Sequence, residues 1–175
     1  VTASATTLCG VTTAPFAQDF ELATFPPNCW TVDGLSNGWA RSTDASGYGT
    51  GTASTFVNFY GISSGSREMT TFEFNKGTLT TPLLKFDHAY ATYSGENDQL
   101  RIDYSTNAGT DWTQLVLYDG GTSGPLNTGG ATTSSFVPTP AQWATKSVTL
   151  PAGTNKLKFV GISGYGNNLF LENIK

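Results

Sequence analysis

Apolar and polar residues alternate along several short stretches of the chain, which is the pattern of β-strands with one buried face. Leu100, Ile102 and Tyr104 alternate with polar or charged residues. The longest such stretch runs from Leu84 to Tyr93 and ends in a turn at 94–98. Further strands are predicted in the second half of the chain at 112–118, 143–150, 156–162 and 168–174.

The first half of the chain predicts shorter strands separated by polar loops. These strands are expected at 16–21, 30–32, 38–42 and 53–60. Loops rich in Ser, Gly and Thr are expected at 43–52 and 61–68, and a long loop at 120–140. No stretch shows helical periodicity for more than about two turns. Many short strands joined by turns indicate an all-β fold, a sandwich or a barrel.

The last predicted strand contains a carboxylate in an unusual position. Phe170, Glu172 and Ile174 share one face by the two-residue period of a strand. A carboxylate is seldom buried unless it is paired or bound to a metal ion, and the chain has only 9 Lys and Arg residues. The pattern therefore leaves two interpretations open: Glu172 binds a cation such as calcium, or it lies solvated at a sheet edge.

Length and charge narrow the class of protein. The 175 residues fit one domain, for which we expect an N-terminal arm or linker at 1–15 and a folded domain at 16–175. The net charge of −4 argues against nucleic acid as a partner. No run of 18 apolar residues predicts a membrane span. The N-terminus shows no signal-peptide pattern, so any such peptide is expected to have been removed.

Cys9 and Cys29 are the only two cysteines. A bridge between them would close a short loop and stabilise the fold by about 3 kcal/mol. The alternative is two free thiols in a reducing compartment. We favour the disulfide, because a Thr- and Gly-rich chain with few lysines is typical of exported proteins.

The candidates for catalysis are weak. His88 is the only histidine and lies in phase with Phe86 and Tyr90, so we expect it in the core. The stretch 61–65, GISSG, matches the G-x-S-x-G motif of serine hydrolases, but no helix is predicted after it, as that motif requires. We therefore expect a protein that is not an enzyme.

Aromatic residues suggest a role in ligand binding, because aromatic faces stack on sugars. At least three of the four tryptophans are expected to be structural, since each lies in a predicted strand. Tyrosines near loops are better candidates for exposed contacts with a ligand: Tyr48, Tyr60, Tyr118 and Tyr165.

Ordered short motifs resemble a known family. The opening carries Phe20-Glu21, Pro26-Pro27, Trp30 and Gly38-Trp39. The motifs LTTP, FDHAYATYSGENDQLRIDYSTNAGTDW and VTLPAGTNKLKFVGISGYGNNLFLENIK follow. Together they resemble MAM-like domains and, more closely, the cleaved-adhesin and choice-of-anchor J domains of secreted Bacteroidetes proteins. The resemblance covers residues 16–175 and implies a two-sheet antiparallel jelly roll, like the galactose-binding and MAM folds.

The resemblance also implies a structural calcium ion. Its ligands carry over to Glu21, Asp98 and Glu172, with Asp19 as a further candidate. This chain has Glu172 where the family usually has Asp.

The function implied is a secreted or cell-surface, non-catalytic adhesion module. Its expected partner is a glycan or, next in order, an extracellular host or matrix protein. The alternatives are a structural spacer packed against a catalytic domain of the same parent chain and, last, a polysaccharide-active enzyme.

Overall fold

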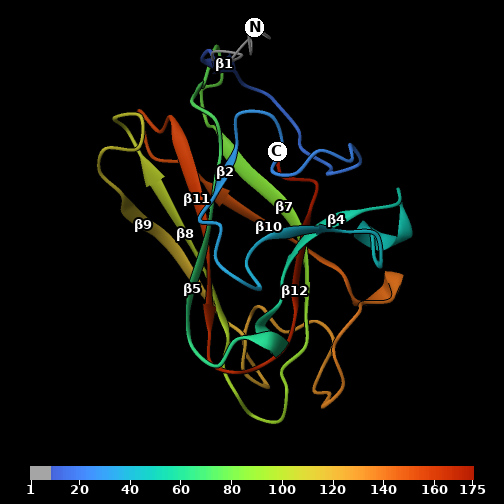
Figure 1. Ribbon diagram of the computed structural model, residues 1–175. Helices are drawn as coiled ribbons and strands as arrows, with labels where there is room; N and C mark the ends of the chain where they lie inside the picture. Colours follow the sequence, from blue (N-terminus) through green and yellow to red (C-terminus); the bar gives the residue numbers. More distant parts are fainter. Residues whose placement is uncertain (1–8) are drawn as a thin grey trace, which may run out of the picture.

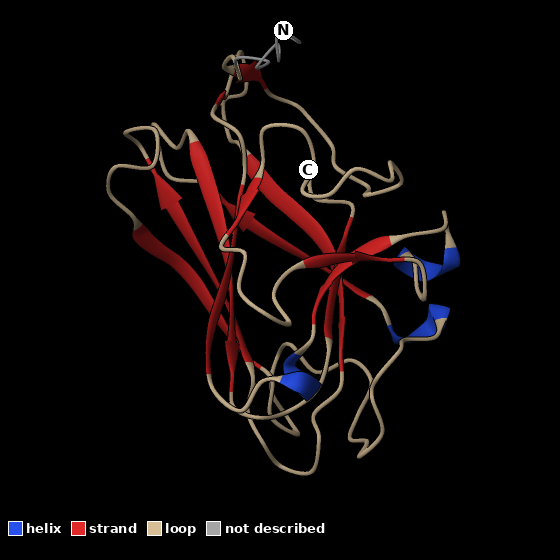
Figure 2. Cartoon of the chain, viewed as in Figure 1, coloured by secondary structure: helices blue, strands red, loops and turns tan. Residues whose placement is uncertain are grey.

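The computed structural model, which describes residues 9–175, is a β-sandwich of two five-stranded antiparallel sheets (Figures 1 and 2). The first, here the β7 sheet, has the spatial order β10 (Ala144–Thr149), β7 (Leu83–Tyr90), β12 (Leu169–Glu172), β4 (Ser54–Val57) and β3 (Ala40–Ser42). The second, here the β8 sheet, has the order β2 (Thr31–Val32), β5 (Gly65–Thr70), β11 (Lys156–Ser163), β8 (Gln99–Ser105) and β9 (Thr113–Asp119).

Short elements complete the fold. β1 (Thr12–Thr13) pairs in parallel with β6 (Phe74–Asn75) near the chain ends. Three 3-10 turns lie in loops: η1 (Gly47–Gly49), η2 (Phe59–Gly61) and η3 (Pro140–Gln142). Residues 9–175 form no α-helix, and none of their helical turns has the length and apolar character needed to cross a membrane. The prediction of an all-β, two-sheet jelly roll is confirmed.

The main core lies between the two sheets and follows the strand alternation. Leu84, Phe86 and Tyr90 of β7 point into it, and Leu100 and Ile102 of β8 meet them from the other sheet. β8 and β9, which are consecutive in the chain, pair antiparallel as a hairpin.

A second cluster of buried side chains covers the outer face of the β7 sheet. Ala89 and Phe170 supply its floor, and Phe136 and Trp143 from the segment before β10 cover them. The ring of Phe170 also stacks on Phe56 of β4, with 5.4 Å between the ring centroids. The last strand is therefore buried on both faces, and all four of its residues are buried.

The final strand does not keep the alternation that the sequence predicts. Phe170 and Glu172 lie on the outer face of the β7 sheet, whereas Ile174 reaches the main core. Asn173 has a φ of 50°, which interrupts the extended backbone between Glu172 and Ile174.

Two predicted segments differ from the structure. The expected polar loop at 61–68 instead runs into β5, which pairs with both β11 and β2. Ser66, Glu68 and Thr70 of β5 lie opposite Ile162, Val160 and Lys158 of β11, and Glu68 forms an ion pair with Lys158 at 2.9 Å. The expected strand at 16–21 is reduced to one bridge between Gln18 and Ile174.

The N-terminal arm is attached to the sandwich. Cys9 and Cys29 form a disulfide, as predicted. β1 pairs with β6 a few residues further on. Residues 1–8 of the predicted arm lie outside the described part of the chain.

Candidate functional site

The carboxylate of Glu172 lies on the outer face of the β7 sheet, opposite Asp87 of β7. Glu172 is 2% exposed, so the interpretation of a solvated edge residue is wrong. Its Oε2 has no hydrogen-bond partner among the described residues. Burial, together with the charges of Glu21, Asp87 and Asp19, raises the pKa of Glu172 to about 8. Three carboxylates therefore act on a fourth that is buried.

The loop at 44–52 closes over this position through glycines. A Cβ at Gly47 would lie 2.6 Å from Glu172 Oε2, and one at Gly51 would collide with Glu21 Oε1. Only glycine permits so close an approach of the backbone to a carboxylate. The backbone of this loop thus lies directly against both side chains.

Glu21 is held beside the loop by polar contacts. Its Oε1 accepts hydrogen bonds from the amides of Thr52 and Ala53 at 2.8 and 3.1 Å. Its Oε2 accepts one from Thr52 Oγ1 at 2.6 Å, and this hydroxyl is the main reason that the pKa of Glu21 is lowered. Arg41 of β3 holds the backbone here by donating to the carbonyl oxygens of Phe20 and Glu21.

Asp19 and Asp87 complete the acidic surroundings. Asp19 is exposed, and its Oδ1 accepts the amide of Glu21 at 3.1 Å. Asp87 accepts from Thr145 Oγ1 at 2.6 Å and from Asn173 Nδ2 at 2.8 Å. Asp87 is not recognisable as a candidate from the sequence, because only the pairing of β7 with β12 places it opposite Glu172.

The residues fit a calcium ion in part. An unpartnered buried carboxylate oxygen and a loop backbone within contact distance are the oxygen donors that calcium prefers. Among residues 9–175, however, no three acidic, histidine or cysteine side chains converge as a ready ligand set. A site here would need backbone carbonyls beside Glu172 and a movement of Glu21 or Asp19 toward it.

Asp98 does not join Glu172, contrary to expectation. Its Oδ1 accepts the amides of Gly164 and Gly166, and its Oδ2 accepts the amide of Asn167 and the hydroxyl of Tyr90. All four contacts are 2.7–3.0 Å long. The three amide donors lie in the loop before β12, at the opposite end of that strand from Glu172. Asp98 is 0% exposed and joins two loops, so we exclude it from the candidate calcium site.

Three tyrosines lie in or near the loops at one end of the sandwich. This is the end that carries η2, at the bottom of Figure 1. Tyr60 of η2 is 43% exposed, and its ring packs edge-on to that of Tyr93, with 6.0 Å between centroids. Tyr165, 59% exposed, lies in the turn after β11, which is linked to η2 by the bond from Ser163 Oγ to the carbonyl of Ile62. We call Tyr60, Tyr93 and Tyr165 the tyrosine end.

The turn that carries Tyr60 is held by amide side chains. Asn58 Oδ1 accepts the amide of Gly61 at 3.1 Å, and Asn37 Nδ2 donates to the Gly61 carbonyl at 2.8 Å. Phe59 is buried at 0% exposure and anchors the turn in the core. Tyr60 therefore projects from a rigid support.

The other two candidate tyrosines differ. Tyr48 is 46% exposed, but it lies in η1 and its hydroxyl contacts Thr145 Oγ1 at 3.0 Å, away from the tyrosine end. Tyr118 lies in β9 rather than in a loop. It packs on the core beside Phe86, with Lys146 Nζ over its ring, so we withdraw it as a ligand contact.

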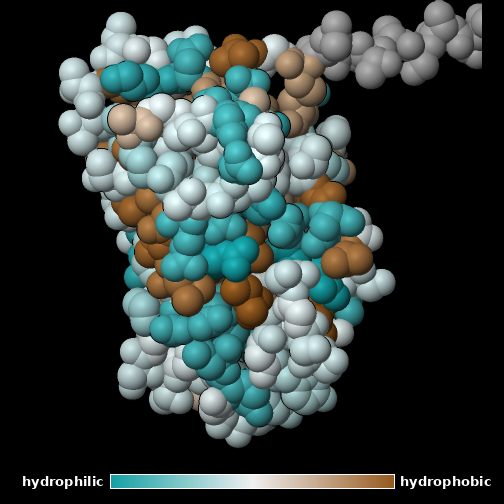
Figure 3. Space-filling model, turned by 90° about the vertical axis from the view of Figure 1, so that its left-hand side faces the viewer, coloured by the Kyte–Doolittle hydropathy of each residue, from teal (hydrophilic) through white to brown (hydrophobic). Residues whose placement is uncertain are grey.

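The tryptophans are mainly structural, as expected. Trp30, Trp39 and Trp143 are at most 5% exposed. Trp112 is partly exposed, but Lys158 Nζ lies 4.6 Å from its ring centroid and covers that face. On the side of the molecule that carries β9, polar side chains separate the apolar ones (Figure 3).

Comparison with known proteins places the fold among adhesin and carbohydrate-binding β-sandwiches. The K1 cleaved adhesin domain of Lys-gingipain from Porphyromonas gingivalis W83 aligns with a TM-score of 0.64 and 16% identity, covering 91% of this chain and 95% of that one. The K2 cleaved adhesin domain of Lys-gingipain aligns with a TM-score of 0.59 and 17% identity, covering 91% and 96%.

A xylan-binding domain from CBM 22 is also similar, with a TM-score of 0.53 and 11% identity over 91% of this chain and 90% of that one. No protein-family model matches the sequence, and no curated protein sequence matches it significantly. At these identities the comparisons establish the fold, and they agree with the family resemblance seen in the motifs.

Proposed function

We propose that this protein is a secreted, non-catalytic module that binds glycans at the tyrosine end and is stabilised by calcium. The observation that carries the binding proposal is the exposed Tyr60 on its rigid turn. An aromatic ring held in place before binding loses little conformational entropy when a sugar stacks on it. Asn58 Nδ2 donates to Asn37 Oδ1 at 3.2 Å, and the Tyr60 hydroxyl donates to the Thr133 carbonyl oxygen at 3.4 Å, so these contacts hold the ring in position.

The fold neighbours support a glycan as the ligand class. The domain from CBM 22 binds xylan, and another neighbour, with a TM-score of 0.50, was solved in complex with β-1,4-galactotriose. The outer face of the β7 sheet in this chain is covered by Phe136 and Trp143. A sugar chain therefore cannot lie across those strands, which favours binding at the loops.

Several features support export and the absence of catalysis. The Cys9–Cys29 disulfide suits an oxidising compartment. His88 is 0% exposed, so no solvent-accessible imidazole is available as a general base. The cleaved adhesin neighbours belong to Lys-gingipain, which supports a role as an accessory module of a larger protein.

The binding proposal is tested by titrating the protein with xylan, mannan and β-1,4-galactan oligosaccharides, with calorimetry as the readout. Tyr60→Ala should weaken binding at least about fivefold, because stacking of one ring on an aromatic side chain is worth about 1–3 kcal/mol. Tyr48→Ala is the matched control and should leave the affinity unchanged. Binding that is absent for every glycan, or insensitive to Tyr60, would overturn the proposal in favour of a protein ligand or a spacer role.

Calcium would be held by Glu172 and Glu21, with Asp19 and backbone carbonyls of the loop 44–52 completing the site. A bound ion supplies two positive charges at a position where several carboxylates repel one another. Melting should therefore occur several degrees higher in millimolar calcium than in EDTA. Glu172→Gln should lose most of this difference. Equal melting temperatures in calcium and EDTA for the unaltered protein would refute the site.

A further inference from the structure

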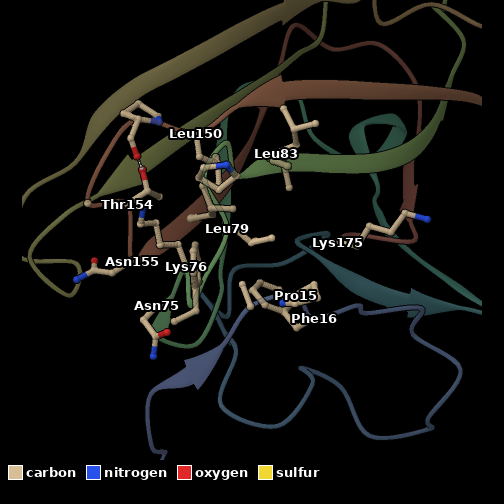
Figure 4. Close-up of a pocket in the computed structure, with 17 residues that line it drawn as sticks. Pro15, Phe16, Asn75, Lys76, Leu79, Leu83, Leu150, Thr154, Asn155 and Lys175 are labelled. Atoms are coloured by element: carbon tan, nitrogen blue, oxygen red, sulfur yellow. Dashed lines mark hydrogen bonds between the residues drawn. The ribbon is translucent and has the colours of Figure 1, made fainter.

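A pocket of about 250 Å³ opens at the end of the sandwich opposite the tyrosine end, beside β1 and the C-terminal residue (Figures 1 and 4). Its floor is part of the main core: Phe74, Leu84 and Leu157, each at most 3% exposed. Its walls come from three separate segments, at 14–16, 75–83 and 150–155. The volume exceeds the roughly 150 Å³ that suffices for an apolar cavity to bind benzene.

Each wall of this pocket contains a proline. Pro15, Pro82 and Pro151 each stand in one of the three segments, and a proline ring fixes φ near one value. Leu79, Leu83 and Leu150 line the space between them. One proline in each segment limits the backbone freedom of the walls, and the pocket is present in the structure without a ligand.

Most polar groups at the pocket are already paired. Asn75 bonds to Thr13 Oγ1 and to the amide of Gly77. Thr154 Oγ1 donates to the carbonyl of Pro151, and Asn155 Oδ1 accepts the amide of Ala108. None of these groups requires a ligand.

The polar side chains that remain free are cationic. Lys76 and Lys175 line the pocket, and neither ammonium group has a hydrogen-bond or ion-pair partner within residues 9–175. No Asp or Glu side chain lines the pocket, although acidic residues outnumber basic ones in the chain by 13 to 9. Figure 4 draws the Lys175 side chain pointing outward, so it stands at the mouth rather than in the cavity.

We propose that this pocket binds a linear aliphatic carboxylate, with the chain between the leucines and prolines and the carboxylate at the mouth near Lys76. The apolar walls suit a hydrocarbon chain and exclude a sugar, whose hydroxyls would find no partners there. A negatively charged head group is complementary to the free ammonium group of Lys76. The site is separate from the tyrosine end and does not depend on glycan binding.

The test is a titration with sodium hexanoate, octanoate and decanoate below their aggregation concentrations, followed by amide chemical shifts. Affinity should rise about fourfold for each added methylene until the pocket is full, from a burial energy of about 0.8 kcal/mol. Shifts should concentrate at 75–84 and 150–157. Decyltrimethylammonium, with the same chain and the opposite charge, should bind more weakly than decanoate.

Variants test separately whether the pocket holds the aliphatic chain and whether Lys76 contacts the carboxylate. Leu79→Trp and Leu83→Trp place a large ring in or over the pocket, and each should abolish decanoate binding while the fold is retained. Leu35→Trp, at an exposed leucine elsewhere, is the control. Lys76→Met should weaken decanoate binding about two- to fivefold and should not weaken that of decyltrimethylammonium.

Affinity that does not depend on chain length, or shifts that map outside the pocket, would overturn the proposal. So would unchanged decanoate binding in both tryptophan variants. Binding of none of the three carboxylates would also overturn it. That result would be expected if the pocket takes only an apolar side chain of a neighbouring domain.

Discussion

At the scale of single residues, the partners of a carboxylate decide what it can do. Asp98 accepts four hydrogen bonds and is fully used in joining the loop at 164–167 to Tyr90. Glu172 is similarly buried but has one oxygen without any partner. Asp98 is therefore a structural anion, and Glu172 is the better candidate for binding a cation.

Asp98→Asn should therefore destabilise the protein without affecting its response to calcium. The amide keeps one acceptor oxygen and turns its NH₂ group toward backbone donors, and each buried donor left unpaired costs about 1–3 kcal/mol. Urea unfolding should show a loss of roughly 2–4 kcal/mol. The exposed Asp119→Asn is the control. If Asp98→Asn abolished the calcium response and Asp119→Asn did not, Asp98 would be a calcium ligand, as the family resemblance implies.

Gly47→Ala should weaken any calcium response. The added Cβ would stand 2.6 Å from Glu172 Oε2 and displace either that carboxylate or the loop. Gly10→Ala makes the same change where no atom lies within 4 Å. The difference in melting temperature between calcium and EDTA should shrink for Gly47→Ala and stay constant for Gly10→Ala.

At the scale of elements, the neighbouring strands β7 and β12 each carry a buried ionisable group, and the two groups change the stability with pH in opposite directions. His88 of β7 lies in the main core with both ring nitrogens unpartnered, and burial lowers its pKa to about 4 from 6.5. Unfolding then takes up a proton between these values, so stability rises with pH. Glu172 of β12 has its pKa raised from 4.5 to about 8, so unfolding releases a proton and stability falls with pH over that range.

In EDTA, these two contributions should oppose each other up to about pH 6.5, and only the fall due to Glu172 remains from there to about pH 8. Unfolding free energies measured across pH 5–8 should show this late decline. His88→Leu should make the decline begin near pH 5. Saturating calcium should abolish it, because the ion stabilises ionised Glu172. A stability that rises between pH 6.5 and 8 in EDTA would contradict this account.

The strands that the sequence predicted well are those with one apolar and one solvated face. β8, β9 and β10 follow this pattern. β5 was missed because its first residues, Gly65 and Ser66, have the composition of a turn, and only pairing with β11 makes them a strand. The double burial of β12 also depends on a distant segment, since Phe136 and Trp143 cover it.

At the scale of the whole molecule, the fold and the disulfide were predictable, but the assembly of the site was not. The strand pattern identified Glu172 as a carboxylate in an unusual position, and the family resemblance added Glu21 and Asp98. Neither could separate Asp98 from the other two, because that requires knowing which end of β12 each residue approaches. Asp87 and Tyr93 become candidates only through strand register and loop packing.

The disulfide should stabilise the whole domain. Its closure of a 20-residue separation corresponds to about 3 kcal/mol in the chain-entropy estimate. Reduction, or replacement of both cysteines by serine, should lower the melting temperature by several degrees. Unreduced protein should not react with an alkylating reagent, and its mass should rise by about two daltons on reduction, since two hydrogens are added. An unchanged melting temperature after reduction would show that the arm does not contribute to stability.

The same bridge sets the path of a mechanical load. Gln18 and Ile174 pair antiparallel, so the two chain ends leave this pair in the same direction, and pulling them apart would peel it open bond by bond. A force that enters at Cys9, however, passes through the covalent bridge to Cys29 and leaves the segment 10–28 slack. The oxidised protein therefore carries tension directly into β2 and the β8 sheet, and the weak pair at Gln18 bears load only after the bridge is reduced.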